Sequence, residues 1–129
     1  MAIRVSGALV DTSLLVAAHA GAELPPAAAI SVITVGELVA GLRLARTDAI
    51  RRRRQTQVDA TRTAYAPLPV DADVAERYGE LLAHARSTKR SEKATDLLIA
   101  ATAAATGRTL HTLDQRQAAL ARSAGIDVA

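Results

Sequence analysis

The apolar positions of this chain concentrate in one block that runs from Lys93 to Gly107. After Asp96 the block carries no charge, and Leu, Ile and Ala occupy every side of a helical wheel. A helix that is apolar on all sides must be buried. Gly107 provides a stop, because glycine readily takes the left-handed conformation that ends helices. The pattern therefore predicts a central buried helix with Asp96 in its first turn.

Shorter apolar segments on either side of this block alternate with helical patterns. Strands are predicted at 8–10, 29–30 and 109–112, with a connector or short strand at 67–70 and a possible last strand at 126–128. Helices are predicted from residue 14, over 32–44, within 47–66, from Asp71 to about 85, and over 115–124. Thr12 or Ser13 is expected to cap the first helix, and Ser31 the second. This alternation predicts one α/β domain over residues 1–129, with helices around a mainly parallel sheet.

Composition narrows the class of protein. Half of the 129 residues are hydrophobic, but only Tyr65 and Tyr78 are aromatic, which argues against base-stacking platforms such as RRM and OB folds. The absence of cysteine excludes disulfides and thiolate metal sites, and fits a reducing cytoplasm. No uncharged run approaches the ~20 residues of a membrane span. We expect a soluble, cytoplasmic protein with no membrane partner.

The charge balance is mildly basic, with a net charge of +3, and arginine greatly outnumbers lysine. Arginine is the better bidentate ligand for phosphate, so nucleic acid is a candidate partner, although coding bias explains the composition equally well. The run Arg51 to Arg54 lies in a predicted helix, where four successive residues point in all directions. We interpret it as part of a solvated helix, with RNA contact as the less favoured alternative.

Four acidic residues stand out by their positions. Asp11 and Asp114 each follow a predicted strand, and the carboxyl ends of parallel strands border the crevice where α/β proteins bind ligands. Asp96 opens the buried helix, and Glu37 is the only carboxylate of a helix that is apolar almost all round. Three of the four have an ordinary alternative: Asp96 as a first-turn acid, Glu37 as a surface glutamate and Asp114 as a helix cap. Gathered together, however, four carboxylates need a cation or raised pKa values, and oxygen-only ligands suit Mg²⁺ or Mn²⁺.

Three segments in this order resemble the PIN-domain ribonucleases, and more narrowly the VapC toxins of bacterial toxin–antitoxin pairs. They are Val10-Asp11-Thr12-Ser13, Ile33-Thr34-Val35-Gly36-Glu37-Leu38 and Asp96-Leu97-Leu98-Ile99-Ala100-Ala101-Thr102-Ala103. The similarity extends from Val10 to Asp114. The segment that begins at Asp96 is the most specific of the three.

The resemblance implies roles for single residues. Asp11, Glu37 and Asp96 match the family's metal-site acids, and Asp114 matches the fourth acid less closely. Many relatives place that acid in a Thr-x-Asn-x-x-Asp-Phe segment, whereas this chain reads Thr-Leu-Asp and contains no Phe. Two further residues match hydroxyl positions around the metal-bound water, although capping or strand polarity would explain them as well: Ser13 and Thr112. For Asp114 we favour an outer-shell role over direct metal binding or simple helix capping.

The resemblance also implies a PIN-like three-layer sandwich, RNA cleavage by Mg²⁺- or Mn²⁺-activated water, a homodimer and a small antitoxin partner. Ribosomal RNA processing and a degenerate scaffold that binds RNA or protein are the alternatives within the family. A phosphoacceptor receiver module is disfavoured, because it needs an adjacent acidic pair after the first strand and a lysine after a late one. Lys89 and Lys93 both precede the buried helix.

Overall fold

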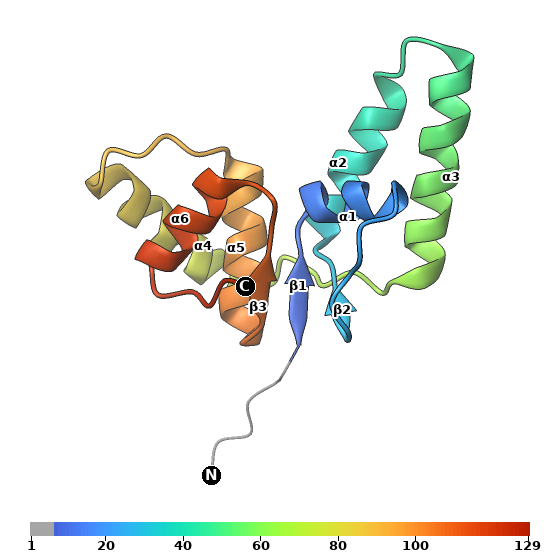
Figure 1. The fold of residues 1–129 in the computed structure, drawn as a ribbon. Helices are drawn as coiled ribbons and strands as arrows, with labels where there is room; N and C mark the ends of the chain where they lie inside the picture. The colour runs from blue at the N-terminus through green and yellow to red at the C-terminus, as the bar shows by residue number, and fades with distance from the viewer. Residues whose placement is uncertain (1–6) are drawn as a thin grey trace.

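A parallel sheet of short strands forms the centre of the protein (Figure 1). The structure is a computed structural model and describes residues 7–129. Within these residues the strand order is β2-β1-β3, and both pairings are parallel. The strands are β1 (Ala8–Val10), β2 (Ala28–Ala29) and β3 (Thr109–His111). The carboxyl ends of β1 and β3 therefore meet at one edge of the sheet, as the sequence pattern predicts.

The helices of the described chain cover both faces of this sheet. They are α1 (Thr12–His19), α2 (Val32–Arg43), α3 (Asp48–Ala64), α4 (Ala72–Ser87), α5 (Ala94–Thr106) and α6 (Gln115–Ser123). Figure 1 shows α4, α5 and α6 on one side of the sheet and α1, α2 and α3 on the other. This arrangement confirms the predicted sandwich. None of the helices described between residues 7 and 129 is long and apolar enough to cross a membrane.

Strand β1 separates two hydrophobic clusters. Leu9 packs with residues of α4, α5 and β3, whereas Val10 packs with Leu15 of α1 and with residues of α2 and α3. Both strand residues are fully buried. Because successive strand side chains point to opposite faces, one short strand joins both halves of the core.

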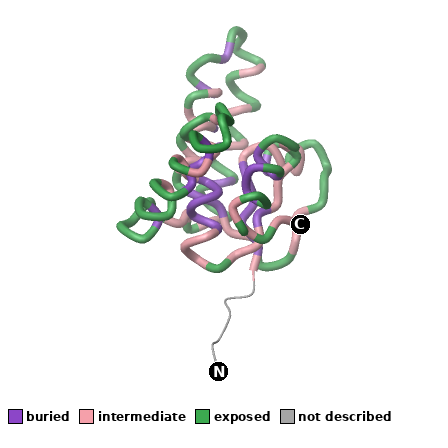
Figure 2. Tube along the Cα trace, turned by 90° about the vertical axis from the view of Figure 1, so that its left-hand side faces the viewer, coloured by how far each residue is buried: buried purple, intermediate pink, exposed green. Residues whose placement is uncertain are grey.

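Helix α5 is the buried helix that its apolar sequence predicts. Between Leu97 and Ala103 every residue except the half-buried Leu98 is buried, and Gly107 ends the helix in the left-handed conformation with φ 66°. Figure 2 shows the buried residues gathered in the middle of the molecule, while the projecting ends of α2 and α3 are largely exposed. Asp96 thus lies in the first turn of the buried helix α5.

The structure corrects three local predictions. Asp11, and neither Thr12 nor Ser13, caps α1, because its carboxylate accepts from the backbone N–H of Leu14. The second strand is Ala28–Ala29, one position earlier than expected. The predicted last strand at 126–128 makes only a single bridge, from Val128 to the middle residue of β3, where Leu110 donates to the carbonyl of Asp127 and accepts from the N–H of Ala129.

Candidate active site

Asp11 lies directly after β1 and is held by three donors from two segments, the first turn of α1 and the residue after β3. Its side chain is only 3% exposed. One carboxylate oxygen, Oδ1, accepts from the N–H of Leu14 at 3.1 Å and from the hydroxyl of Ser13 at 2.8 Å. The other, Oδ2, accepts from the hydroxyl of Thr112, just beyond β3. The charge of this buried carboxylate is therefore compensated by hydrogen bonds, as a buried anion requires.

Ser13 and Thr112 both act on Asp11, so the structure brings together three residues singled out in the sequence. The hydroxyl oxygen of Ser13 also accepts from the N–H of Leu113 at 3.1 Å. The hydroxyl oxygen of Thr112 accepts from the N–H of Asp114 at 2.9 Å. These contacts join the first turn of α1 to the loop that follows β3, at the carboxyl-end edge of the sheet.

Glu37 reaches the same region from α2. Its Oε1 accepts from the hydroxyl of Thr12 at 2.7 Å, and the Thr12 oxygen lies 3.1 Å from the hydroxyl of Thr34. Glu37 is half-buried, less enclosed than its apolar helix predicts. Thr34, by contrast, is fully buried. From the sequence, Thr12 was expected only as a possible helix cap and Thr34 had no predicted role; the available signal was a pair of hydroxyl residues near two of the candidate acids.

The pKa of the half-buried Asp96 carboxyl is raised from its ordinary value of 3.8 to about 6. Burial is the largest cause, and the negative charges of Asp114, Glu37 and Asp11 add to it. Lys93 acts in the opposite direction. The four acids therefore lie close enough to affect one another, although they come from four separate segments of the chain.

Asp114 caps α6. Its Oδ1 accepts from the N–H of Arg116 at 2.9 Å and from that of Gln117 at 3.2 Å. The helix cap that we weighed as an alternative is therefore present in the structure. The second oxygen of Asp114 makes no hydrogen bond to the described residues, so capping leaves it free for another role.

Gln117 is a buried connection that sequence reasoning missed. Its side chain is 2% exposed, its Nε2 donates to the backbone carbonyl of Asp96 at 3.1 Å, and its Oε1 lies 3.2 Å from the hydroxyl of Thr112. It thus links the first turn of α5 to the hydroxyl that binds Asp11. The available signal was a polar residue on the otherwise apolar face of a predicted helix.

The chemistry of this donor set fits a hard divalent cation such as Mg²⁺ or Mn²⁺, because it consists of carboxylate and hydroxyl oxygens. Among residues 7–129, no three acidic or histidine side chains stand close enough together to hold an ion jointly as they are placed. The acids can still affect the pKa of Asp96 at these separations, because electrostatic repulsion acts over longer distances than metal coordination. Coordination needs oxygens about 2.0–2.6 Å from the ion. Like charges spread apart unless a cation lies between them.

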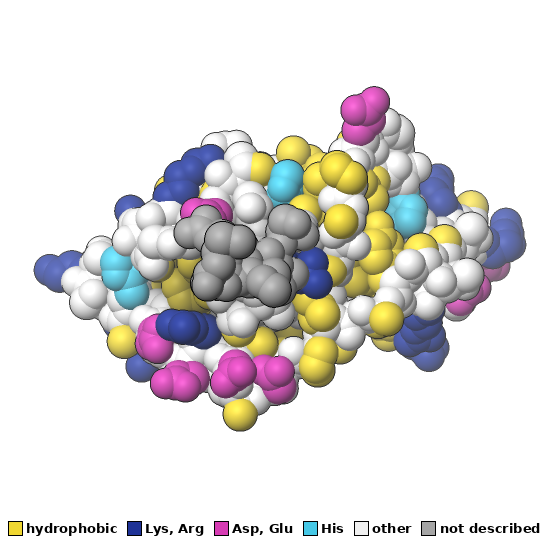
Figure 3. Space-filling model, turned by 90° about the horizontal axis from the view of Figure 1, so that it is seen from below, with side chains coloured by type: hydrophobic (Ala, Val, Ile, Leu, Met, Phe, Trp, Pro, Cys, Tyr) yellow, Lys and Arg dark blue, Asp and Glu magenta, His cyan; other side chains and the backbone are white. Residues whose placement is uncertain are grey.

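A cavity of about 650 Å³ lies at the other end of the same helices and contains none of the four acids. It is lined by the last turn of α5, by residues of α4 such as Arg77 and Glu80, and by the segment after α6, which includes Asp127. Figure 3, which views the molecule from below, shows acidic, basic and hydrophobic side chains interspersed on this side. The cavity contains none of the four acids and carries charges of both signs, so the acidic edge is the better candidate for a cation-binding active site.

Comparison with known proteins agrees with this fold. Residues 8–123 match the PIN domain family. Ribonuclease VapC8 of Mycobacterium tuberculosis is 43% identical over 100 residues, which cover 74% of this chain and 88% of VapC8. The chain therefore belongs to the PIN-domain family and, within it, to the VapC ribonucleases.

Two further comparisons extend over nearly the whole chain. Ribonuclease VapC5 of Mycobacterium tuberculosis is 31% identical over 133 residues, which cover 99% of this chain and 98% of VapC5. The crystal structure of VapBC-5 from the same organism, a member of the VapBC family of toxin–antitoxin systems, superposes with a TM-score of 0.82. That match has 32% identity and covers 95% of this chain and 96% of the other.

Proposed function

We propose that this protein is an endoribonuclease that requires a divalent metal ion and acts as the toxin of a toxin–antitoxin pair. The convergence of acids on Asp96 is the observation that carries the proposal: the charges of Asp114, Glu37 and Asp11 all raise the pKa of Asp96. Such a cluster costs stability unless it serves a cation. Membership of the VapC ribonucleases supports RNA as the substrate.

In this proposal the residues that would hold or orient the ion are Asp11, Glu37, Asp96 and Asp114. Ser13 and Thr112 would keep both oxygens of Asp11 in place, because their hydroxyls already donate to them. Thr12 would orient Glu37 in the same way. When bound, Mg²⁺ or Mn²⁺ lowers the pKa of water and offsets negative charge on the phosphodiester.

A small antitoxin and a second copy of this chain are the proposed protein partners. The VapBC-5 structure is a member of a toxin–antitoxin family, and it matches nearly the full length of this chain. A toxin role predicts that expression arrests growth through RNA cleavage. Expression of Asp96→Asn at an equal protein level should leave growth unimpaired, and equal toxicity of the variant would contradict this role.

The decisive experiment measures RNA cleavage with Mg²⁺, with Mn²⁺ and with EDTA. Asp96→Asn should reduce the cleavage rate at least 100-fold and weaken Mn²⁺ binding in calorimetry. Asp73→Asn is the matched control, since Asp73 also lies in the first turn of a helix but is exposed on α4. Cleavage that persists in EDTA, or an Asp96→Asn variant as active as Asp73→Asn, would overturn the proposal.

A further inference from the structure

Two basic regions differ in where they lie relative to the four acids. One is the run Arg51 to Arg54 on α3. The other, which we call the basic rim, consists of Lys89, Arg90 and Lys93 in the loop between α4 and α5, together with Arg116 in the first turn of α6. All four residues of the basic rim are exposed. Figure 1 shows the loop crossing to the end of α5 that carries Asp96.

The basic rim is fastened to the active site at Arg116. The guanidinium Nη2 of Arg116 donates to the carbonyl of Ser91 at 2.9 Å, and its Nε lies 3.8 Å from a carboxylate oxygen of Glu92. The Glu92 side chain is only 8% exposed, so the loop is anchored against α6. The backbone N–H of Arg116 binds the Asp114 carboxylate. The rim and the acidic cluster therefore share a segment of backbone.

Lys93 lies at the other contact between rim and site. It is the N-cap residue of α5, three positions before Asp96, and its positive charge lowers the Asp96 pKa against the other influences. Lys93 makes no ion pair with the other residues that the structure describes. Its charge is therefore available to a ligand that approaches Asp96.

Lys89 occupies a backbone conformation that favours glycine. Its φ is 58°, in the turn that ends α4, where the N–H of Arg90 donates to the carbonyl of Ala85 at 2.8 Å. Glycine is the usual residue at such a helix end, because a side chain is strained in this conformation. A lysine at this position gives up stability and places a charge on the rim.

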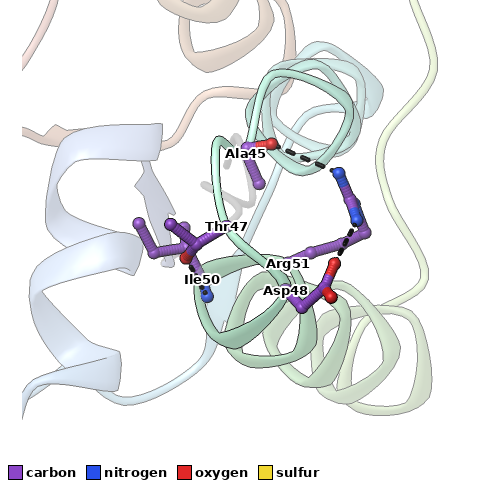
Figure 4. A network of polar contacts seen from close by, with 5 residues as sticks. All are labelled: Ala45, Thr47, Asp48, Ile50 and Arg51. Carbon is purple, nitrogen blue, oxygen red and sulfur yellow. Dashed lines mark hydrogen bonds and ion pairs between the residues drawn. The ribbon is translucent and has the colours of Figure 1, made fainter.

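The arginine run on α3 uses half of its side chains within the fold. Figure 4 shows Arg51 between the carboxylate of Asp48 and the carbonyl of Ala45, at 2.9 and 3.4 Å. Arg54 is half-buried and donates to the carbonyl of Gly41. Two of the four arginines thus attach α3 to the end of α2. Only Arg52 and Arg53 lack an ion pair or hydrogen bond with described residues.

We propose that the basic rim binds RNA phosphates that flank the bond to be cut, and that the run on α3 does not. The proposal rests on the ribonuclease function proposed above. A site that contains four carboxylates repels a polyanionic substrate, so cations beside it must supply the attraction. The rim has the required sign, exposure and position, and RNA is favoured over an acidic protein because the acids it borders are those proposed to cleave RNA.

The test compares two variants that each lose two positive charges: Lys89→Gly with Lys93→Gln on the rim, and Arg52→Gln with Arg53→Gln on α3. Binding of a labelled single-stranded RNA is measured in EDTA over a range of salt concentrations. The rim variant should bind about tenfold more weakly, with a log–log salt slope smaller by about 1.4, which is two contacts at about 0.7 each. The α3 variant should match the wild type in RNA affinity and in salt slope.

A second pair of variants separates function from folding. Ala27 is the other described non-glycine residue with positive φ, at 54°, so Ala27→Gly and Lys89→Gly should both raise the melting temperature. Only Lys89→Gly should also weaken RNA binding. Loss of binding in both variants, or in neither, would overturn the role of Lys89.

Cleavage assays distinguish failure of this inference from failure of the proposed function. The rim variant should raise KM with little change in kcat, because it removes substrate binding and leaves the acids intact. If the wild type cleaves RNA but the rim variant keeps its RNA affinity and salt slope, the rim inference is wrong and the ribonuclease function stands. That result would assign the rim to an acidic protein partner. If the wild type cleaves no RNA with either metal, the proposed function itself fails.

Discussion

Asp11 and Asp96 are both acids at the carboxyl-end edge of the sheet, yet the protein treats their charges in opposite ways. Asp11 is buried, and its two oxygens accept hydrogen bonds from Leu14, Ser13 and Thr112. The Asp96 carboxylate accepts none from the residues that the structure describes, and its pKa is raised to about 6. One charge is compensated by the chain and the other is not.

This difference indicates separate contributions to one site. Hydrogen bonds fix the Asp11 carboxylate before any ligand arrives, which is the preorganisation that a metal or substrate site needs. Asp96 instead retains an uncompensated charge on a rigid helix, where a cation gains most by binding. The two acids should therefore be equally necessary for cleavage and opposite in their effects on stability.

The largest expected effect comes from removing each acid in turn. Asp11→Ala and Asp96→Asn should each reduce RNA cleavage at least 100-fold. Asp11→Ala should also destabilise the protein by about 2 kcal/mol, because it removes a helix cap and leaves Thr112 without its acceptor. Asp96→Asn should stabilise the metal-free protein, since it removes a repelled charge. Thermal unfolding in EDTA measures the stability of both variants. An equal fall in melting temperature for Asp11→Ala and Asp96→Asn would contradict the proposed difference between the two acids.

Gln117 should come next, because it connects the two acids through Thr112 and the Asp96 backbone. Gln117→Met keeps the side-chain volume but removes both polar contacts. We expect kcat to fall about 10–100-fold with KM nearly unchanged, as for residues that position a site without touching substrate. Gln115→Met is the control, because Gln115 is exposed on the same helix. A Gln117→Met variant with lower stability but wild-type kcat would reduce Gln117 to a packing role.

Asp114 separates capping from catalysis. Asp114→Asn keeps an acceptor for the N–H groups of Arg116 and Gln117, so its stability should stay near that of the wild type. Asp114→Ala should lose about 1 kcal/mol. Both should slow cleavage about 10-fold or more while weakening Mn²⁺ binding less than Asp11→Ala does. A fall in Mn²⁺ affinity as large as that of Asp11→Ala would make Asp114 a direct ligand.

The smallest effect is a pH dependence that belongs to Asp96. Its pKa is about 6 in the folded protein, above its ordinary value of 3.8, so the folded state binds the proton more tightly. The stability of the wild type relative to Asp96→Asn should then fall as pH rises from about 4 to 6, and stay level above that range. Water screens this half-exposed carboxyl, so the melting temperatures should separate by only about 1–3 °C. A difference that is the same at pH 4 and pH 7 would remove the charge explanation.

Local pattern was sufficient for much of the fold. The uncharged block after Asp96 could only be a buried helix, and α5 is one. Strand β1 was also predictable from the sequence, because its three apolar residues are followed directly by the polar Asp11. Prediction failed where local signals competed. Asp11, Thr12 and Ser13 all belong to residue types that cap helices, and in the structure Asp11 takes the cap position of α1. The last strand failed for a different reason, because its segment pairs with β3 through Leu110 alone, which makes an isolated bridge and not a ladder.

By itself, the sequence determined which acids stand at strand ends and in apolar helices, because burial pattern and residue type are local properties. Only the tertiary structure decided how each acid is held. Thr112 binds Asp11 across 101 positions because β1 and β3 are neighbouring parallel strands. Gln117 reaches the Asp96 carbonyl because α6 packs on α5. Such contacts depend on distances between elements, which no local pattern encodes. They leave the Asp11 carboxylate hydrogen-bonded and the Asp96 carboxylate exposed to repulsion by the other acids.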